Sequence, residues 1–425
     1  MNAVITSTGG RPGAILLSPS HTRRLVETIR VWLEGGMQLD EVRDMELLLP
    51  QRRSLGLVVN NECNLSCPHC YLQIPHLSGP RLNAGEWRRV IDSAVKEGIE
   101  QFLLVGKEAL FGQTGPQVLG MLGEIRAQHS DLRTGIITNG MLLHKHYDLV
   151  QRANLSHMDI SMEGDAEDHD AIRGTGAFAA IRSNVERAAR LLGERLFATM
   201  TLQKRNIRRL DKALMAFVGL GVRSVALAPY KSMPYTDASL DLSDEDYRDF
   251  FAGLKRLGQL PLPHEVMLQV DACAACPEML LHFMESGWFD LEAMVANGTG
   301  FLYLNRKLRN GLILSFRFQP WPVSFDIHAR VTADGALICA ADAYNARAYG
   351  VNQLANVRDF GFDFGSAFRA ASLNPRLSLL DSNFESDLAP RIRAAYYGRP
   401  TPLTVVAAFD SLETKEAQTQ LVGVS

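Results

Sequence analysis

The sequence has no apolar run of 18 residues, and this absence excludes a predicted transmembrane helix. In the first 24 residues the one apolar run is Ala14–Leu17, too short for the core of a secretory signal peptide. Cysteine is scarce as well, with six in 425 residues, so a framework of disulfide bonds is not expected. These absences together predict a cytoplasmic protein.

Neither sign of charge is in excess, because 44 Lys and Arg residues stand against 47 Asp and Glu residues, for a net charge of −3. This balance argues against nucleic acid or an anionic membrane as a partner. Hydrophobic residues make up 46% of the chain, enough for a folded barrel and a smaller domain.

Three of the six cysteines, Cys63, Cys67 and Cys70, lie close together in a C-x3-C-x2-C loop. Thiolates are the usual ligands of iron-sulfur clusters, and this loop offers three of them without a fourth. It therefore predicts a cluster in which one iron is left open to another ligand. Two alternatives are His69 as a fourth ligand and a zinc site, although zinc is typically bound by paired C-x2-C units.

The cysteine loop is followed by Tyr71, and in this it resembles the loop of the radical S-adenosylmethionine (SAM) enzymes. The resemblance implies an α/β fold, a partial (β/α)6 TIM barrel with its chemistry at the carboxyl ends of the strands. One intervening helix is predicted in detail, because Asn83 and Glu86 form a capping-box pattern ahead of an apolar face. Short apolar runs predict parallel strands at 55–60, 101–106, 134–138, 157–161, 196–201 and 224–228.

Gly106, Lys107 and Glu108 follow the second predicted strand, where the family usually has Gly-Gly-Glu-Pro. The resemblance implies that this segment receives the methionine ammonium group of SAM, with Glu108 as its charged partner. Lys107 and Ala109 depart from the family pattern. The alternative interpretation is an ordinary turn at the end of a strand.

Polar residues also follow the next two predicted strands, with Asn139 after the third and Ser161 and Glu163 after the fourth. The resemblance implies that Ser161 and Arg173 hold the carboxylate and ribose of SAM, while Glu163 replaces the usual Asp. The alternative for Glu163 and Arg173 is an ion pair on a surface loop. The candidate cofactor-binding residues are thus Tyr71, His69, Gly106, Lys107, Glu108, Asn139, Ser161, Glu163 and Arg173.

The other three cysteines are Cys273 and Cys276, in a C-x2-C pair, and Cys339, on the returning strand of a hairpin predicted at 325–339. This hairpin resembles the SPASM and twitch extensions of the family, which implies a second, auxiliary 4Fe-4S cluster on the three cysteines. The longer cysteine series of a full SPASM domain is missing. Inert buried cysteines are the alternative. Candidates for the fourth ligand are Asp342, Tyr344 and the substrate.

These features divide the chain into four predicted parts. Residues 1–50 form a helical N-terminal segment, too short for a separate leader-peptide-binding domain. Residues 240–320 are expected to be mostly helical. The parts are 1–50, a barrel at 51–255, a smaller α+β auxiliary-cluster domain at 256–375 and a tail at 376–425.

The family resemblance implies that a reduced 4Fe-4S cluster cleaves SAM to a 5'-deoxyadenosyl radical, which abstracts a hydrogen atom from the substrate. Because all six cysteines are assigned to clusters, none is left as a hydrogen donor, and oxidation or bond formation is favoured over epimerisation. The main interpretation is a small-molecule substrate of natural-product type. A ribosomal peptide, sulfur insertion from the auxiliary cluster and a non-enzymatic electron carrier are the alternatives. The implied partner is a reductant of the flavodoxin or ferredoxin type.

Overall fold

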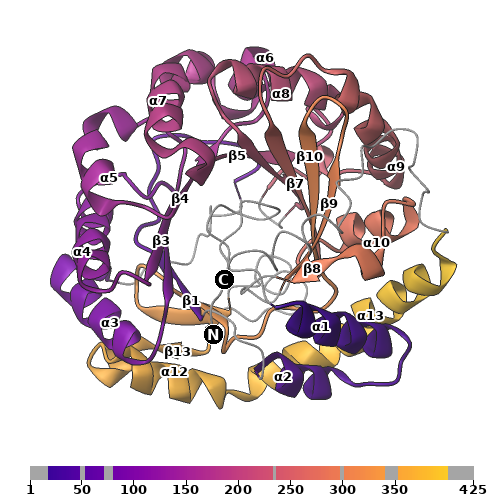
Figure 1. Ribbon diagram of the computed structural model, residues 1–425. Helices are drawn as coiled ribbons and strands as arrows, with labels where there is room; N and C mark the ends of the chain where they lie inside the picture. The colour runs from indigo at the N-terminus through magenta and orange to yellow at the C-terminus, as the bar shows by residue number, and fades with distance from the viewer. Residues whose placement is uncertain are drawn as a thin grey trace, which may run out of the picture.

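The structure, a computed structural model, describes residues 18–47, 53–70, 80–232, 236–296, 301–339 and 353–400. Seen end-on, its strands form an open barrel with helices around the outside (Figure 1). All six strands expected from the sequence are present within a residue or two of the expected bounds, and neighbours pair in parallel. The predicted partial barrel is therefore confirmed. The strands are β1 Ser54–Val58, β2 Gln101–Val105, β3 Arg133–Thr138, β4 His157–Ser161, β5 Leu196–Leu202 and β6 Ser224–Pro229.

Helices connect these strands and cover the outer face of the sheet (Figure 1). In α3 the predicted capping box is present, since Asn83 accepts from the amide of Glu86 at 3.0 Å while the Glu86 carboxylate accepts from the amide of Asn83 at 2.8 Å. The apolar face of α3 is buried, with Trp87 and Val90 fully inaccessible. The connecting helices are α3 Ala84–Lys96, α4 Thr114–Gln128, α5 Tyr147–Ala153, α6 Ala166–Arg173, α7 Ala177–Leu192 and α8 Leu210–Gly219.

The sheet continues on both sides of the six-stranded part. On one side β7 (Val266–Cys273) and β10 (Leu312–Gln319) extend it in parallel, and on the other β11 (His328–Val331) pairs in parallel with β1. Within the described residues the strands form one sheet of 13, in the order β13-β12-β11-β1-β2-β3-β4-β5-β6-β7-β10-β9-β8. The remaining strands are β8 Val295–Ala296, β9 Leu302–Lys307, β12 Ala336–Cys339 and β13 Ala355–Asn356.

The expectation that residues 240–320 are mostly helical is right for α9 (Asp244–Gly253) and α10 (Pro277–Glu285), but it missed the strands β7, β9 and β10 in this range. In β10 apolar Leu314, Phe316 and Phe318 alternate with polar Ser315, Arg317 and Gln319. This period of two is the pattern of a strand with two different faces.

The predicted hairpin is present as β11 and β12, with the turn at Thr332–Gly335. The amide of Gly335 donates to the Thr332 carbonyl at 2.9 Å, and Gly335 has φ +91°, a conformation that favours glycine. The first strand begins at His328 and not at Phe325, because Ser324 starts a turn whose carbonyl accepts from the amides of Ile327 and His328.

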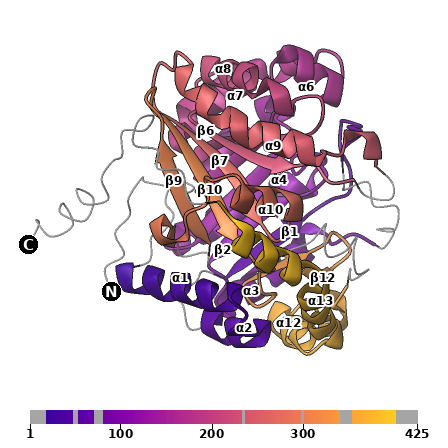
Figure 2. The same ribbon diagram turned by 90° about the vertical axis from the view of Figure 1, so that its right-hand side faces the viewer.

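The remaining helices lie at the chain ends and after β6. Near the N-terminus, α1 and α2 pack beside α13 at the edge of the barrel (Figure 2), with Trp32 stacked on Phe384 at 6.0 Å between ring centres. Helix α13 fills most of the first half of the segment predicted as a tail. No helix in the described residues is long and apolar enough to cross a membrane. These helices are α1 Pro19–Leu33, α2 Leu39–Leu47, α9 Asp244–Gly253, α10 Pro277–Glu285, α12 Phe364–Ser372 and α13 Pro375–Gly398.

One sheet runs through the predicted domain boundary at 255, since β6 and β7 pair directly, and through the later part of the chain, since β11 pairs with β1. The division into a barrel and an auxiliary domain remains a prediction. Single 3-10 turns complete the description, at Leu143–Lys145, Gly193–Arg195, Ile207–Arg209, Ala238–Leu240, Leu254–Gln259, Leu291–Ala293 and Val357–Phe360.

Candidate active site

The cysteine loop directly follows β1, so Cys63, Cys67 and Cys70 lie at the carboxyl end of a central strand. The amide of Cys70 donates to the Cys67 carbonyl at 3.1 Å, and the amide of Leu65 donates to Cys63 Sγ at 3.3 Å. Burial raises the pKa of the Cys67 thiol to about 11, and the Cys70 and Cys63 thiols contribute to this rise. The three thiols are thus close enough to influence one another electrostatically.

This donor set fits an iron-sulfur cluster better than a single metal ion. Within the described ranges, no three His, Cys, Asp or Glu side chains converge closely enough to bind one ion. The cysteine ligands of a 4Fe-4S cluster each bind a different iron, so their sulfur atoms are farther apart than the ligands of one zinc ion. Three neighbouring thiols could each bind one iron of the predicted cluster and leave the fourth iron without a cysteine ligand.

Asn139, immediately after β3, connects that strand to the cysteine loop. Its Nδ2 atom donates to Asn64 Oδ1 at 2.9 Å and lies 3.5 Å from Cys63 Sγ. Its Oδ1 atom accepts from the amide of Met141, which fixes the orientation of the side-chain amide. Asn139 therefore lies beside the cysteine loop, and its role in cofactor binding stays a prediction.

Glu108 lies at the end of β2 with 1% of its surface exposed. Its Oε1 atom accepts from Thr138 Oγ1 at 2.7 Å and from the amide of Leu110 at 2.9 Å, while Oε2 accepts from the amide of Asn139 at 2.7 Å. Burial raises the pKa of the carboxyl group, and these hydrogen bonds oppose the rise. Both oxygens already have partners in the chain, so Glu108 ties the end of β2 to the end of β3.

The neighbours of Glu108 hold the first part of the cysteine loop. The amides of Lys107 and Glu108 donate to the carbonyls of Asn60 at 3.2 Å and Glu62 at 3.0 Å. A Cβ atom on Gly106 would lie 2.8 Å from Asn60 Oδ1, so glycine is needed for this close approach. The Gly106–Glu108 segment thus supports the loop through its backbone.

Glu163 and Arg173 form a buried ion pair, so their interpretation as an exposed surface pair is wrong. Arg173 donates to Glu163 Oε1 from Nε at 3.0 Å and from Nη2 at 2.5 Å, and their side chains are 10% and 0% exposed. The same Oε1 atom lies 3.6 Å from His69 Nε2 in the cysteine loop. Burial alone would raise the pKa of Glu163, but Arg173 and His69 lower it below its ordinary value.

Two further contacts fix this group at the ends of β4 and β5. The amide of Thr201 donates to Glu163 Oε2 at 2.9 Å, and the amide of Glu163 donates to His169 Nδ1 at 3.2 Å. Burial lowers the pKa of His169 to about 4, so its ring is neutral near pH 7. Ser161 is the last residue of β4, two residues before Glu163 and level with Thr199 of β5. Tyr71 lies outside the described residues.

Comparison with known proteins identifies this part of the chain. Residues 57–217 match the family model described as the Radical SAM superfamily. These residues form a radical SAM domain. The matched residues contain the end of β1 and all of β2–β5. All nine candidate cofactor-binding residues lie among them, and the structure describes every one except Tyr71. The match to this family confirms the predicted SAM-binding 4Fe-4S cluster and SAM as cofactors.

Three relatives illustrate the similarity. The chain is 27% identical over 182 residues to the PqqA peptide cyclase of Granulibacter bethesdensis, covering 41% of this chain and 46% of the relative. It is 23% identical over 145 residues to the GTP 3',8-cyclase of Synechocystis, covering 32% and 42%. The structure of Streptococcus suis SuiB bound to precursor peptide SuiA superposes with a TM-score of 0.51 at 13% identity, covering 83% and 69%. The chain thus spans less than half the length of these two curated relatives.

Outside the radical SAM domain, Cys273 and Cys276, two of the three cysteines predicted for a second cluster, lie in one turn. Cys273 ends β7, and the amide of Cys276 donates to its carbonyl at 2.7 Å. The Cys276 thiol donates to the Cys273 sulfur, which lowers the pKa of Cys273 and raises that of Cys276. Cys339 ends β12, level with Ala329 of β11, and packs against the hydrophobic core. Asp342 and Tyr344 lie outside the described residues.

Sequence reasoning missed an ion pair beside Cys273. Arg317 of β10 bonds to Asp271 of β7 and lies over the ring of Phe301 at 4.7 Å. The two charged residues are directly opposite each other in the β7–β10 pairing. Burial lowers the pKa of Arg317, but Asp271 and Cys273 raise it more. The polar alternation of β10 was the signal that could have revealed this pair.

Gln203, one residue after β5, was also missed. It is completely buried, and neither atom of its side-chain amide has a hydrogen-bond partner in the described structure. No motif marks a single glutamine at a strand end, so the sequence carried no signal for it.

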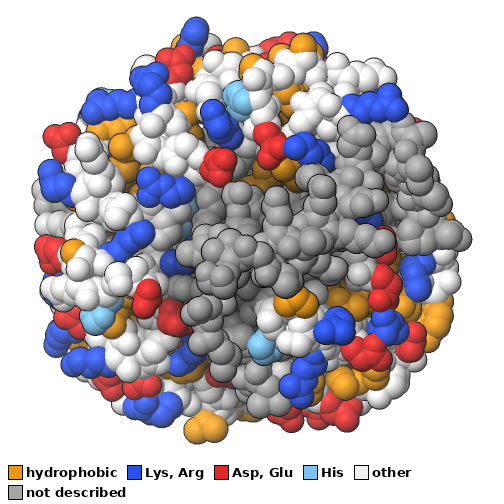
Figure 3. Space-filling model, in the orientation of Figure 1, with side chains coloured by type: hydrophobic (Ala, Val, Ile, Leu, Met, Phe, Trp, Pro, Cys, Tyr) orange, Lys and Arg blue, Asp and Glu red, His pale blue; other side chains and the backbone are white. Residues whose placement is uncertain are grey.

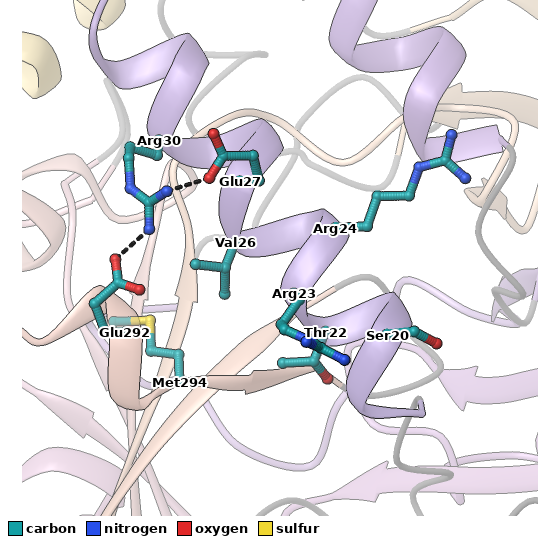
Figure 4. A pocket seen from close by; sticks show the side chains of 9 residues that line it. All are labelled: Ser20, Thr22, Arg23, Arg24, Val26, Glu27, Arg30, Glu292 and Met294. Carbon is teal, nitrogen blue, oxygen red and sulfur yellow. Dashed lines mark hydrogen bonds and ion pairs between the residues drawn. The ribbon is translucent and has the colours of Figure 1, made fainter.

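The described surface offers no comparably organised site. On the face seen in Figure 3, Lys and Arg side chains are interspersed with Asp and Glu. Figure 4 shows a cavity of about 540 Å³ between α1 and residues 292–294. Its Arg30 is bonded to both Glu27 and Glu292, so these charges largely compensate one another.

Proposed function

We propose that this protein is a radical SAM enzyme that oxidises or forms a bond in a peptide substrate. The observation that carries the proposal is the C-x3-C-x2-C loop, which is attached to the carboxyl ends of β2, β3 and β4 through Glu108, Asn139 and Glu163. Cys63, Cys67 and Cys70 would hold the cluster, and cluster and SAM when bound supply the radical that removes a substrate hydrogen atom.

The chain's own residues position these groups. Asn139 and the His69–Glu163 contact hold the loop from two sides, so the direction of the cysteines is set by the barrel. Ser161 and Arg173, at the carboxyl end of β4 and on the following helix, are proposed to hold SAM beside the loop. The surrounding strand ends limit the access of water to a radical.

A peptide is favoured over the small-molecule substrate that the sequence first suggested. One curated relative is a peptide cyclase, and the structurally similar SuiB was crystallised with a precursor peptide. A small molecule is the second candidate, supported by the relative that acts on GTP.

The first experiment tests the cluster and SAM cleavage. Anaerobically reconstituted protein, reduced with dithionite and supplied with SAM, should form 5'-deoxyadenosine. Replacing Cys63, Cys67 and Cys70 by alanine should abolish this product, because no other thiolates lie in the loop. Ser66→Ala, an exposed change in the same loop, is the matched control and should have no effect. Undiminished cleavage by the triple variant would contradict the assignment.

The second experiment tests the auxiliary cluster, which we propose on Cys273, Cys276 and Cys339. Two 4Fe-4S clusters correspond to about eight irons per chain and one cluster to about four. Replacement of these three cysteines by alanine should lower the iron content from about eight to about four while SAM cleavage persists. An iron content near four in the unmodified protein would identify the three as structural cysteines.

The third experiment separates the substrate classes. Peptides encoded beside the gene and GTP are each incubated with the reduced protein and SAM, and products are identified by mass. A peptide that loses hydrogen atoms or gains a cross-link supports the proposal. Modification of GTP with every peptide unchanged would favour the small-molecule candidate.

A further inference from the structure

The strands β7 and β10 have two faces of different character. On the outer face apolar side chains pack against helices, as where Phe316 stacks on Phe283 of α10 at 4.7 Å between ring centres. The helices lie outside the strands (Figure 1), and successive side chains of a strand face opposite sides of the sheet, so the alternate residues belong to the inner side of the open barrel. There Gln269 pairs with Ser315 and, two residues on, Asp271 with Arg317.

This inner face contains hydrogen-bonding atoms that the described chain does not satisfy. Gln269 and Ser315 are 1% and 0% exposed, and Gln269 Oε1 and Ser315 Oγ have no hydrogen-bond partner, nor does Arg317 Nε. Gln269 Nε2 donates to Asp271 Oδ1 at 2.9 Å. That bond fixes the orientation of the Gln269 amide. The unsatisfied atom is therefore the oxygen Oε1, an acceptor that needs an N–H or O–H donor.

Unsatisfied polar atoms on this inner face lower the stability of the folded protein if no ligand bonds to them. A buried polar group without a partner destabilises a folded chain, and a buried ion pair can often be exchanged for apolar residues without loss of stability. The outer faces of β7 and β10 have apolar side chains at the alternate positions. Polar residues kept against this energetic preference are typical of functional surfaces.

We propose that the inner face of β7 and β10, at Gln269, Ser315 and Arg317, binds the backbone of a peptide segment of the substrate. This inference rests on the proposed peptide substrate. One amide unit carries an N–H for the Gln269 oxygen and a C=O for the Ser315 hydroxyl or Arg317 Nε. Gln269 and Ser315 stand opposite each other on neighbouring strands, which lie about 5 Å apart. The surface lies beside Cys273, so it would present the substrate next to the proposed second cluster.

The test uses N-methylacetamide, the smallest convenient molecule with one peptide bond, and the cluster-loaded protein. Crystals soaked with it should show the probe bonded to Gln269 Oε1, and its dissociation constant is measured by NMR titration. Ser315→Ala should weaken binding about three- to tenfold, the value of one hydrogen bond. It should not lower the melting temperature, because the hydroxyl has no partner to lose.

Ser224→Ala is the matched control. Ser224 is 2% exposed on the adjacent strand β6, but its hydroxyl donates to the Glu194 carbonyl at 3.2 Å. This variant should lower the melting temperature and leave probe affinity unchanged. Crystals with ordered water alone on Gln269 and Ser315, or unchanged probe affinity in Ser315→Ala, would overturn the inference. Failure of SAM cleavage or of peptide modification would count against the proposed function, since probe binding depends on neither.

Discussion

Replacing Arg173 by alanine should destabilise the protein strongly, because it removes the main partner of a fully buried carboxylate. Arg173, the last residue of α6, donates twice to Glu163 Oε1, at 3.0 and 2.5 Å. Without it, the charge of Glu163 retains, among the residues that the structure describes, the amide of Thr201 at 2.9 Å and the more distant ring of His69 at 3.6 Å. In the intact packing no solvent contacts this carboxylate, since Glu163 is 0% exposed.

Removing one partner of a buried ion pair lowers the free energy of unfolding by about 3–5 kcal/mol, because the remaining charge stays desolvated. The helix α7 provides a contrasting pair, Arg182 and Glu186, whose side chains are 65% and 33% exposed. An exposed pair of this spacing contributes about 0.3–0.5 kcal/mol. The two alanine variants, Arg173→Ala and Arg182→Ala, should thus differ about tenfold in their effect on the free energy of unfolding.

Urea unfolding followed by circular dichroism measures both effects. A third variant, with Arg173→Met and Glu163→Leu together, should recover most of the stability lost in Arg173→Ala, since it leaves no uncompensated charge. In the same Arg173→Ala protein, SAM affinity should fall about tenfold or more if the guanidinium also bonds to SAM, while the first cluster keeps about four irons. A destabilisation no larger than that of Arg182→Ala would refute the argument, and unchanged SAM affinity would remove Arg173 from the proposed SAM site.

Three further predictions follow from buried or capping contacts. The pKa of His169 is about 4 in the folded protein and about 6.5 in the unfolded chain, so the protein should lose up to about 3 kcal/mol of unfolding free energy as the pH falls from 6.5 to 4. The unfolded chain takes up the proton first, and His169→Asn, which keeps an acceptor for the Glu163 amide, should flatten that part of a pH–stability curve. Glu108→Gln should cost about 1–3 kcal/mol in urea unfolding, because an amide N–H2 would replace one of two accepting oxygens. Asn83→Ala should cost about 1 kcal/mol by removing the cap of α3, and a thermal scan showing no change would contradict that role.

The strands and helices that the sequence predicted are those with strong local signals. In β1–β6 short apolar runs between helices determined the bounds, and in α3 the capping box did so. β7 and β10 were missed because their polar inner residues interrupt the apolar run, and a helix was expected from the surrounding pattern. The polar residues of β7 and β10 face one another across the paired strands, and a short segment of sequence does not show which strands pair.

In the candidate site, too, the sequence predicted what is local and missed the contacts between distant residues. The cysteine spacing alone predicted the loop, since three thiolates at that spacing have few other uses. The contact between His69 and Glu163 joins residues far apart in the chain, and it exists only because β1 and β4 end at the same side of the barrel. Glu108 was assigned to SAM by resemblance, whereas its hydrogen bonds to Thr138 and Asn139 give it a structural connection that no motif encodes.

These contacts explain how an irregular loop can hold three cysteines in a fixed arrangement. Residues 59–70 contain no helix or strand, so their backbone cannot hold its own shape. At the end of β2 the amides of Lys107 and Glu108 donate to the carbonyls of Asn60 and Glu62 in the loop. The end of β3 holds Cys63 through Asn139, and the end of β4 reaches His69 through Glu163. The cysteine geometry therefore depends on three strand ends, and Asn139→Ala should lower the affinity of the loop for iron although no cysteine is changed. Iron content after a chelator challenge measures this, with Asn310→Ala as the control, since the Asn310 amide donates to the carbonyls of Leu257 and Leu260 and not to the loop. Equal iron retention in the two variants would mean that the loop keeps its shape without Asn139.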